Sequence, residues 1–211
     1  MENAPMRPTL TYLLAVPLLV AANGFFVASE FALVAVRRSR IVSLADSGDH
    51  RALLLLELLD NLNSYISATQ LGITMSSLAL GWVGEPALAS LLEAPLHGRV
   101  SDALLHTISF TVAFTAITVL HIVLGELAPK TLALERAERV ALAIAWPMRI
   151  FHKLFHWPVR LLDWAGTRTV RCFGLTPTGS HASVYTVDEL RQIIDVSHKS
   201  EIGRASCRER V

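Results

Sequence analysis

A long apolar run that ends in a carboxylate constrains this chain more than any other feature. Residues 109–124 are almost wholly apolar, and Gly125-Glu126-Leu127-Ala128-Pro129-Lys130 follows directly. An ionisable group at membrane depth costs roughly 2.5–3.5 kcal/mol on insertion scales, so such a group usually serves an ion, a proton or a transport pathway. Glu30 is a second carboxylate inside an apolar run. The two acids together predict an ion-handling site between membrane helices.

The composition is that of a membrane protein. Hydrophobic residues make up 52% of the chain and charged residues 18%, with a mean hydropathy of +0.45. A net charge of +1 argues against a nucleic-acid-binding protein, which would carry a basic surface. The two cysteines, Cys172 and Cys207, are too few for a zinc cluster or a disulfide framework, and we expect two free thiols. The first apolar run is too long for a cleaved signal peptide.

Three apolar segments are long enough to cross a bilayer, which needs about 20 residues of helix. They are residues 10–36, 65–83 and 104–127. The second is rich in small and hydroxylated residues, which let helices approach closely in lipid, so we expect it at the centre. We therefore predict an all-α membrane protein with three transmembrane helices. A shorter leucine-rich segment, residues 52–59, is predicted to lie on the membrane or to pack beneath the bundle.

Residues 140–165 have the pattern of an amphipathic helix at the membrane surface. Apolar residues recur at helical spacing, charged residues cover the opposite side, and three tryptophans add rings that settle at headgroup level. Pro147 and Pro158 are expected to bend or break this helix. The pattern predicts a juxtamembrane belt helix that wraps the bundle. A fourth transmembrane helix is the alternative.

The distribution of Lys and Arg predicts the orientation. Positive residues follow the first and third spans, whereas the connection between the second and third spans holds two acids and a single arginine. Because cytoplasmic loops are enriched in Lys and Arg, we expect a multi-pass protein of the cell (inner) membrane with its N-terminus outside and its C-terminus in the cytoplasm.

The chain divides into three predicted regions. Residues 1–171 are expected to form the transmembrane domain with its juxtamembrane helix. Residues 172–202 combine a Gly-, Pro- and Thr-rich linker with a helix whose start is marked by a capping box at Thr186 and Glu189. This helix is expected to lead to a cytosolic domain. Residues 203–211 fit no preceding pattern and are expected to be a non-native tail.

The three predicted spans carry polar groups that could face one another. In the second span they are spaced by four and three residues, which places them on one helix face. Pro129 lacks an N–H and clashes with the carbonyl of Gly125, so carbonyls near Gly125 should be available to a cation. An all-oxygen donor set suits a hard ion such as Mg²⁺, Na⁺ or Ca²⁺. The predicted metal ligands are Ser29, Gln70, Thr74, Ser77, Gly125 and Glu126.

Each of these groups also has a structural explanation. The hydroxyls of the second span could bond to carbonyls of their own helix. Glu30 could pair with Arg37 or Arg38, which follow the first span. His121 could be a packed, hydrogen-bonded histidine and not a ligand.

Glu126 is harder to explain as an ordinary ion pair. It precedes Lys130 by four residues, the favoured helical spacing for such a pair. Pro129 between them disturbs that geometry, and this favours the ion site. Four residues near the predicted ligands are assigned structural or gating roles: Glu30, His121, Pro129 and Lys130.

Four motifs occur in order along the chain: Phe25-Phe26-Val27-Ala28-Ser29-Glu30, Gln70-Leu71-Gly72-Ile73-Thr74, Gly84-Glu85-Pro86 and Gly125-Glu126-Leu127-Ala128-Pro129-Lys130. In order and spacing they resemble the transmembrane domain of the CorC/CNNM magnesium transporters, and the resemblance covers roughly residues 10–200. Residues 187–198 are similar to the acidic helix that leads into this family's paired CBS domain, which binds ATP.

The resemblance implies three transmembrane helices and a belt helix, assembled as a homodimer in the lipid bilayer. It implies Mg²⁺ export coupled to Na⁺ entry, with Mg²⁺ held by Ser29, Gly125, Glu126 and a polar residue of the second helix. Many members have Asn where this chain has Ile73. An apolar side chain cannot ligate, so Gln70, Thr74 and Ser77 are the candidates nearby.

The sequence therefore predicts a Mg²⁺ transporter and not an enzyme. The alternative is a membrane-anchored ion sensor or scaffold that does not transport. A serine protease is disfavoured because the chain has no Gly-x-Ser-x-Gly motif.

Overall fold

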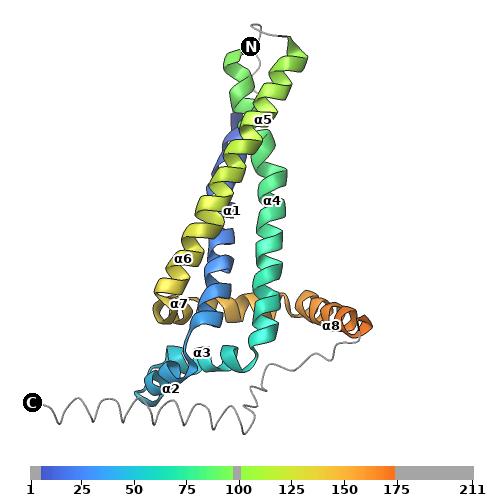
Figure 1. Cartoon of the computed structure of the whole chain (residues 1–211). Helices are drawn as coiled ribbons and strands as arrows, with labels where there is room; N and C mark the ends of the chain where they lie inside the picture. Colours follow the sequence, from blue (N-terminus) through green and yellow to red (C-terminus); the bar gives the residue numbers. More distant parts are fainter. Residues whose placement is uncertain (1–5, 97–100, 174–211) are drawn as a thin grey trace, which may run out of the picture. The chain divides into compact units, whose positions relative to one another are not determined.

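The secondary structure is helical throughout the part of the chain that the computed structural model describes, residues 6–96 and 101–173 (Figure 1). This confirms the prediction of an all-α fold. The predicted acidic helix and tail lie outside the described residues. Contacts divide the chain into two units, Met1–Ala165 and Gly166–Val211, and the candidate site lies within the first. The elements are α1 (Met6–Ala35), α2 (Arg38–Asp46), α3 (His50–Asp60), α4 (Leu62–Leu96), α5 (Asp102–Leu120), the π-helix η1 (His121–Leu127), α6 (Ala128–Glu135), α7 (Ala137–Leu154) and α8 (His156–Cys172).

Two helical stretches among the described residues are long and apolar enough to cross a membrane. They are Leu14–Ala35 in α1 and Ala103–Glu135, which runs continuously through α5, η1 and α6. They match the first and third predicted spans. The second predicted span lies within α4, which has 35 residues but does not reach the same hydropathy. Its hydroxyl and amide side chains account for the difference, and α4 as a third transmembrane helix stays a prediction.

Glycines bring the long helices together. In Figure 1, α1 and α4 lie beside the continuous α5–η1–α6 helix, and contacts join α1 to α4, η1 and α6 and join α4 to α5. A Cβ added at Gly72 of α4 would lie 2.5 Å from the ring of Phe26 in α1. One added at Gly84 would lie 3.0 Å from Ile117 Cδ1 in α5. Such close contacts hold helices together where lipid removes the hydrophobic driving force.

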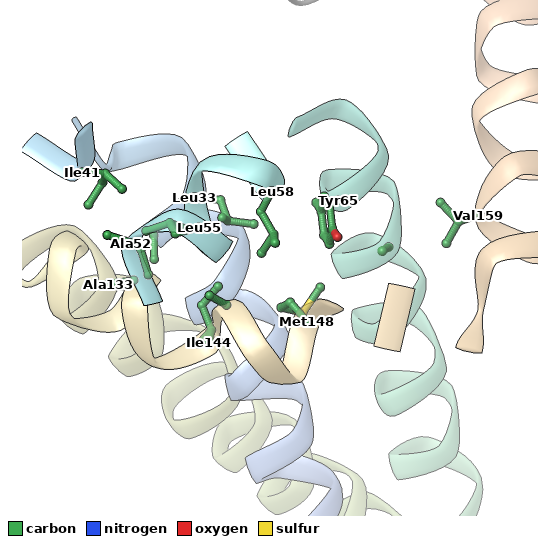
Figure 2. Close-up of a cluster of buried hydrophobic side chains, with 14 residues drawn as sticks. Leu33, Ile41, Ala52, Leu55, Leu58, Tyr65, Ala133, Ile144, Met148 and Val159 are labelled. Carbon is green, nitrogen blue, oxygen red and sulfur yellow. The ribbon is translucent and has the colours of Figure 1, made fainter. Parts of the chain in front are cut away.

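An apolar cluster fills the junction where the C-terminal end of α1 meets α3 and α7 (Figure 2). The leucine-rich segment predicted at residues 52–59 lies in α3, and α3 contacts α7. Its buried face therefore packs beneath the bundle, which is one of the two predicted arrangements. The large side chains of the cluster that are no more than 5% exposed are Leu33, Ile41, Leu55, Leu58, Ile144, Met148 and Val159.

The predicted belt helix is two helices in the structure. α7 ends at Leu154 and α8 begins at His156, so the break falls at Phe155. Pro147 lies inside α7, whereas Pro158 lies in the first turn of α8, where a missing N–H costs no hydrogen bond. The apolar face of α7 is buried against the bundle and Trp146 on the other side is exposed. The position of α7 at a membrane surface stays a prediction.

His152 joins α7 to the start of α4. Its ring stacks on Tyr65 at 4.5 Å between centroids, and its Nε2 lies 2.9 Å from Ser64 Oγ. The ring of His156 lies 5.8 Å away, and Asp163 accepts a hydrogen bond from Ser67 close by. Burial, followed by the neighbouring His156, lowers the pKa of His152, and Asp163 opposes this shift. The lowered pKa favours the neutral imidazole in this contact.

The stability of this junction should depend on pH. Because the folded-state pKa of His152 is lowered, the unfolded chain binds the proton first as pH falls below about 6.5, the ordinary histidine value. We expect the midpoint of thermal unfolding to fall between about pH 7 and pH 5.5 for the chain in detergent.

His152→Gln should reduce this pH dependence, because Gln can still bond to Ser64 but does not titrate. His50→Gln, an exposed histidine of α3, is the matched control and should leave it unchanged. If the unfolding midpoint changes equally with pH in the wild type and in His152→Gln, His152 does not cause the pH dependence of this junction's stability.

Candidate ion site at the π-helix

A π-helical segment, η1, lies between α5 and α6 and directly precedes the turn that contains Pro129. Proline has no N–H to donate to the carbonyl of Gly125, four residues back. Instead, the N–H of Ala128 donates to the carbonyl of Val123, five residues back. The wider turn lets the helix continue past Leu127, near which the third span was predicted to end, to Glu135. Single π-helical turns inside α-helices are frequent at functional sites.

The carbonyl of Gly125 is bonded to another helix. Asn23 Nδ2 in α1 donates to Gly125 O at 3.0 Å, and Asn23 is fully buried. Ser77 Oγ in α4 donates to Asn23 Oδ1 at 3.1 Å and lies 3.4 Å from His121 Nε2. One polar network, buried at Asn23 and Gly125 and partly buried at Ser77 and His121, therefore links α1, α4 and η1. The helix widens into a π-helix near Gly125, but the Gly125 carbonyl, which was predicted to be available to a cation, is bonded to Asn23 in this structure.

Two glycines make room for this network. A Cβ at Gly125 would lie 2.8 Å from His121 Cδ2 and 3.1 Å from Asn23 Nδ2. A Cβ at Gly24 would lie 2.9 Å from Pro129 Cγ and 3.2 Å from the carbonyl oxygen of Leu124. The ring of Pro129 therefore packs directly on the α1 backbone. His121 is a hydrogen-bonded member of the network.

Two of the predicted hydroxyl ligands bond within their own helices. Ser29 Oγ donates to Phe25 O at 2.7 Å, and Thr74 Oγ1 donates to Gln70 O at 2.8 Å. Each hydroxyl keeps lone pairs that could still accept a bond or meet a cation. Ser29 is buried and lies roughly 9 Å further along α1 than Asn23, at 1.5 Å per residue.

Glu30 and Gln70 form a second polar pair, next to Ser29. The Gln70 side chain lies beside the Glu30 carboxylate. Arg38 pairs with Asp60 at 2.6 Å, so the predicted alternative of a Glu30–Arg38 pair was wrong. Within the described residues, Glu30 also makes no ion pair with Arg37. Together, Ser29, Glu30 and Gln70 form a second polar level, distinct from the Asn23 network.

Glu126 is exposed on the surface of the single chain. It makes no ion pair with any described residue, and Lys130 instead places its ammonium over the Phe31 ring at 4.5 Å, a cation–π contact. The Glu126–Lys130 pair considered from the sequence is therefore not formed. No group of three or more His, Cys, Asp or Glu in the described part of the chain could hold a metal. A cation at the Asn23 network would need neutral oxygens together with this one carboxylate.

Comparison with known proteins identifies the family. The model of the Cyclin M transmembrane N-terminal domain, CNNM, matches residues 13–206. This chain belongs to the CNNM family. The resemblance predicted from the four motifs is confirmed, and with its two apolar spans the chain is a membrane domain.

Bacterial proteins of known sequence are similar to this CNNM domain. It is 43% identical over 190 residues to UPF0053 protein YhdT of Bacillus subtilis, covering 89% of this chain and 41% of that protein. It is 40% identical over 199 residues to UPF0053 protein YugS of the same organism, covering 93% of this chain and 46% of the other. It is 35% identical over 186 residues to the uncharacterized protein Rv1841c of Mycobacterium tuberculosis, covering 88% of this chain and 53% of that protein. The chain thus spans about half the length of these relatives.

Sequence reasoning did not assign Asn23 a role in the site. Asn23 and Gly24, about one and a half turns before Ser29, were placed among the polar groups of the three spans that could face one another, but Asn23 was not among the predicted ligands. The signal that could have found it is Gly24 beside it, because a glycine next to a buried amide marks close approach by another backbone.

Substitution at Gly24 should break this packing. Gly24→Ala forces a methyl group into the Pro129 ring and should cost about 1–3 kcal/mol, measured as a lower midpoint of thermal unfolding in detergent. Gly81→Ala is the matched control, because nothing lies within 4 Å of a Cβ at that position of α4. The close contact is refuted if both substitutions have the same effect.

Proposed function

We propose that this CNNM domain is the membrane part of a Mg²⁺ transporter that exports Mg²⁺ in exchange for Na⁺. The observation that supports this most is the polar network of Asn23, Ser77, His121 and Gly125, in which Asn23 and Gly125 are buried and Glu126 is the residue after Gly125. Polar groups buried between helices and centred on a π-helix mark an ion pathway. The resemblance to the CorC/CNNM magnesium transporters supplies the identity of the ion.

In this proposal the network exchanges internal hydrogen bonds for bonds to the ion. Asn23 Oδ1, Ser77 Oγ and Gly125 O are neutral oxygens, and Glu126 supplies the charge. Without the ion, Asn23 Nδ2 donates a hydrogen bond to the Gly125 carbonyl. When Mg²⁺ binds, the ion takes the place of the Asn23 N–H at that carbonyl oxygen. Mg²⁺ releases water reluctantly and needs six ligands, so several waters remain bound. A site with one carboxylate per chain binds weakly, which suits a transporter that must release its ion.

The second polar level would give the ion a second place to bind along its path. Ser29 and Glu30 lie roughly 10 Å along α1 from Asn23, and Gln70 of α4 lies beside Glu30, so an ion leaving the network meets another carboxylate and amide. Thr74 lies on α4 between the two levels. Of the predicted ligands, Ser77, Gly125 and Glu126 belong to the first level, and Ser29 and Gln70 belong to the second.

We propose further that a second copy of the chain covers Glu126. A carboxylate exposed to lipid is costly, and the adjoining face of α5 is an open apolar groove. Thr107, Thr111 and Thr115 follow one another at spacings of four, and each hydroxyl donates to the carbonyl four residues back. This leaves a row of methyl groups on which another helix can pack closely. The groove is lined by Thr111, Val112, Thr115, Ala116, Val119, Leu120, Val123 and Leu124.

Removing the charge at Glu126 should abolish transport. Glu126→Gln keeps the size of the side chain but removes the carboxylate of the residue that follows Gly125, so Mg²⁺ affinity should fall roughly tenfold or more. Titration calorimetry with the purified chain measures binding, and Mg²⁺ flux into proteoliposomes measures transport.

The matched control is Asp46→Asn, an exposed carboxylate of α2 that lies outside both polar levels. It should leave binding and flux unchanged. Flux retained in Glu126→Gln would contradict the proposed site. Mg²⁺ binding without any flux in the wild type would favour the ion sensor over the transporter.

The proposed dimer can be tested separately by cross-linking. In a background where Cys172 and Cys207 are replaced by Ser, Thr115→Cys should form a disulfide-linked dimer in membranes within minutes of mild oxidation. Leu18→Cys, 70% exposed on α1, is the control and should stay monomeric. Efficient cross-linking at Leu18 with none at Thr115 would place the dimer contact on another face.

A further inference from the structure

An open cavity of about 610 Å³ lies where both apolar spans end. It is lined by Ala35, the last residue of the first span, and by Glu135, the last residue of the other. Helices that cross a bilayer leave the hydrocarbon core where their apolar stretch ends. In a bilayer crossed by both helices, this position would lie near the lipid headgroups. Its other lining residues are Arg37, Leu134, Arg136, Ala137, Glu138 and Arg139.

The charges in this cavity favour an anion. None of the described residues forms an ion pair with Arg37, Arg136 or Arg139. Of the two carboxylates, Glu138 is paired with Arg40, at 3.4 Å between Arg40 Nε and a carboxylate oxygen. Three unpaired arginines thus face one unpaired carboxylate, Glu135. Arginine presents a planar fork of N–H donors that fits phosphate oxygens in pairs.

Exposed apolar side chains precede the cavity-lining residues on both helices. Leu134 lines the cavity and is 53% exposed, and Leu132 of α6 and Val34 of α1 are 48% and 61% exposed. A ligand with a phosphate and acyl chains could contact both parts, whereas a soluble phosphate could contact only the arginines. This combination distinguishes a lipid from a free anion.

We propose that this cavity binds the headgroup phosphate of an anionic phospholipid, with the guanidinium groups of Arg37, Arg136 and Arg139 on the phosphate and Leu134 against an acyl chain. Basic pockets between membrane helices bind anionic headgroups in this way. The cavity is lined by the end of α1 and by the connection between α6 and α7. A lipid bound there would contact both and would hold the two span ends at a fixed distance. This site is separate from the ion site at the π-helix.

Native mass spectrometry of the whole chain in neutral detergent, titrated with phosphatidylglycerol or phosphatidylcholine, tests the proposal. The wild type should retain phosphatidylglycerol in preference to phosphatidylcholine. The double variant Arg136→Gln/Arg139→Gln should bind phosphatidylglycerol roughly 25-fold more weakly. Each arginine lost should weaken binding roughly fivefold, which is the attraction of one basic residue to an anionic lipid. The matched control, Lys153→Gln/Arg160→Gln, loses the same charge outside the cavity and should bind within about twofold of the wild type.

Arg37→Gln provides a second variant if the double variant does not fold, and it should weaken binding roughly fivefold. Glycerol phosphate, added in excess, should not displace the lipid. Displacement by glycerol phosphate would overturn the lipid assignment in favour of a soluble phosphate. Equal losses in the two double variants, or no preference for phosphatidylglycerol in the wild type, would overturn the site itself.

Discussion

The hydrogen bond from Asn23 Nδ2 to the carbonyl of Gly125 is the contact on which the centre of this domain depends. Pro129 deprives that carbonyl of its helical partner, and the π-helix η1 accommodates the change without ending the helix. A buried carbonyl without a partner costs about 1–3 kcal/mol, so another helix has to supply a donor. Asn23 supplies it from α1, and Ser77 fixes the orientation of the amide from α4.

The rest of the bundle is arranged around this contact. Close approach of α1 to η1 needs Gly24 and Gly125, and close approach of α1 to α4 needs Gly72. Apolar packing holds the other end, where α3 and α7 close the junction (Figure 2). The long helices are thus joined by small residues and a polar network in one part and by an apolar cluster in the other. An ion that disturbs the polar network can shift the helices there while the cluster stays intact.

Much of the fold could be predicted from the sequence, because hydrophobic length and helical spacing are local signals. The two apolar spans, the helix at residues 52–59 and the amphipathic residues after 140 all follow from them. The release of the Gly125 carbonyl also followed from Pro129 alone. Its partner did not, because Asn23 lies 102 residues away and only the packing of α1 on η1 brings them together. The π-helical register is likewise invisible in residue spacing, so the helix was predicted to end too early.

The central contact can be measured directly by solid-state nuclear magnetic resonance on the chain in lipid bilayers, with ¹⁵N in asparagine side chains and ¹³C in glycine carbonyls. Because the chain also contains Asn3, Asn61 and Asn63, loss of the signal in Asn23→Ala assigns it to Asn23. The account predicts a dipolar coupling between Asn23 Nδ2 and the Gly125 carbonyl without Mg²⁺, and a weaker coupling at saturating Mg²⁺. No coupling in the ion-free protein, or a coupling unchanged by Mg²⁺, would contradict it.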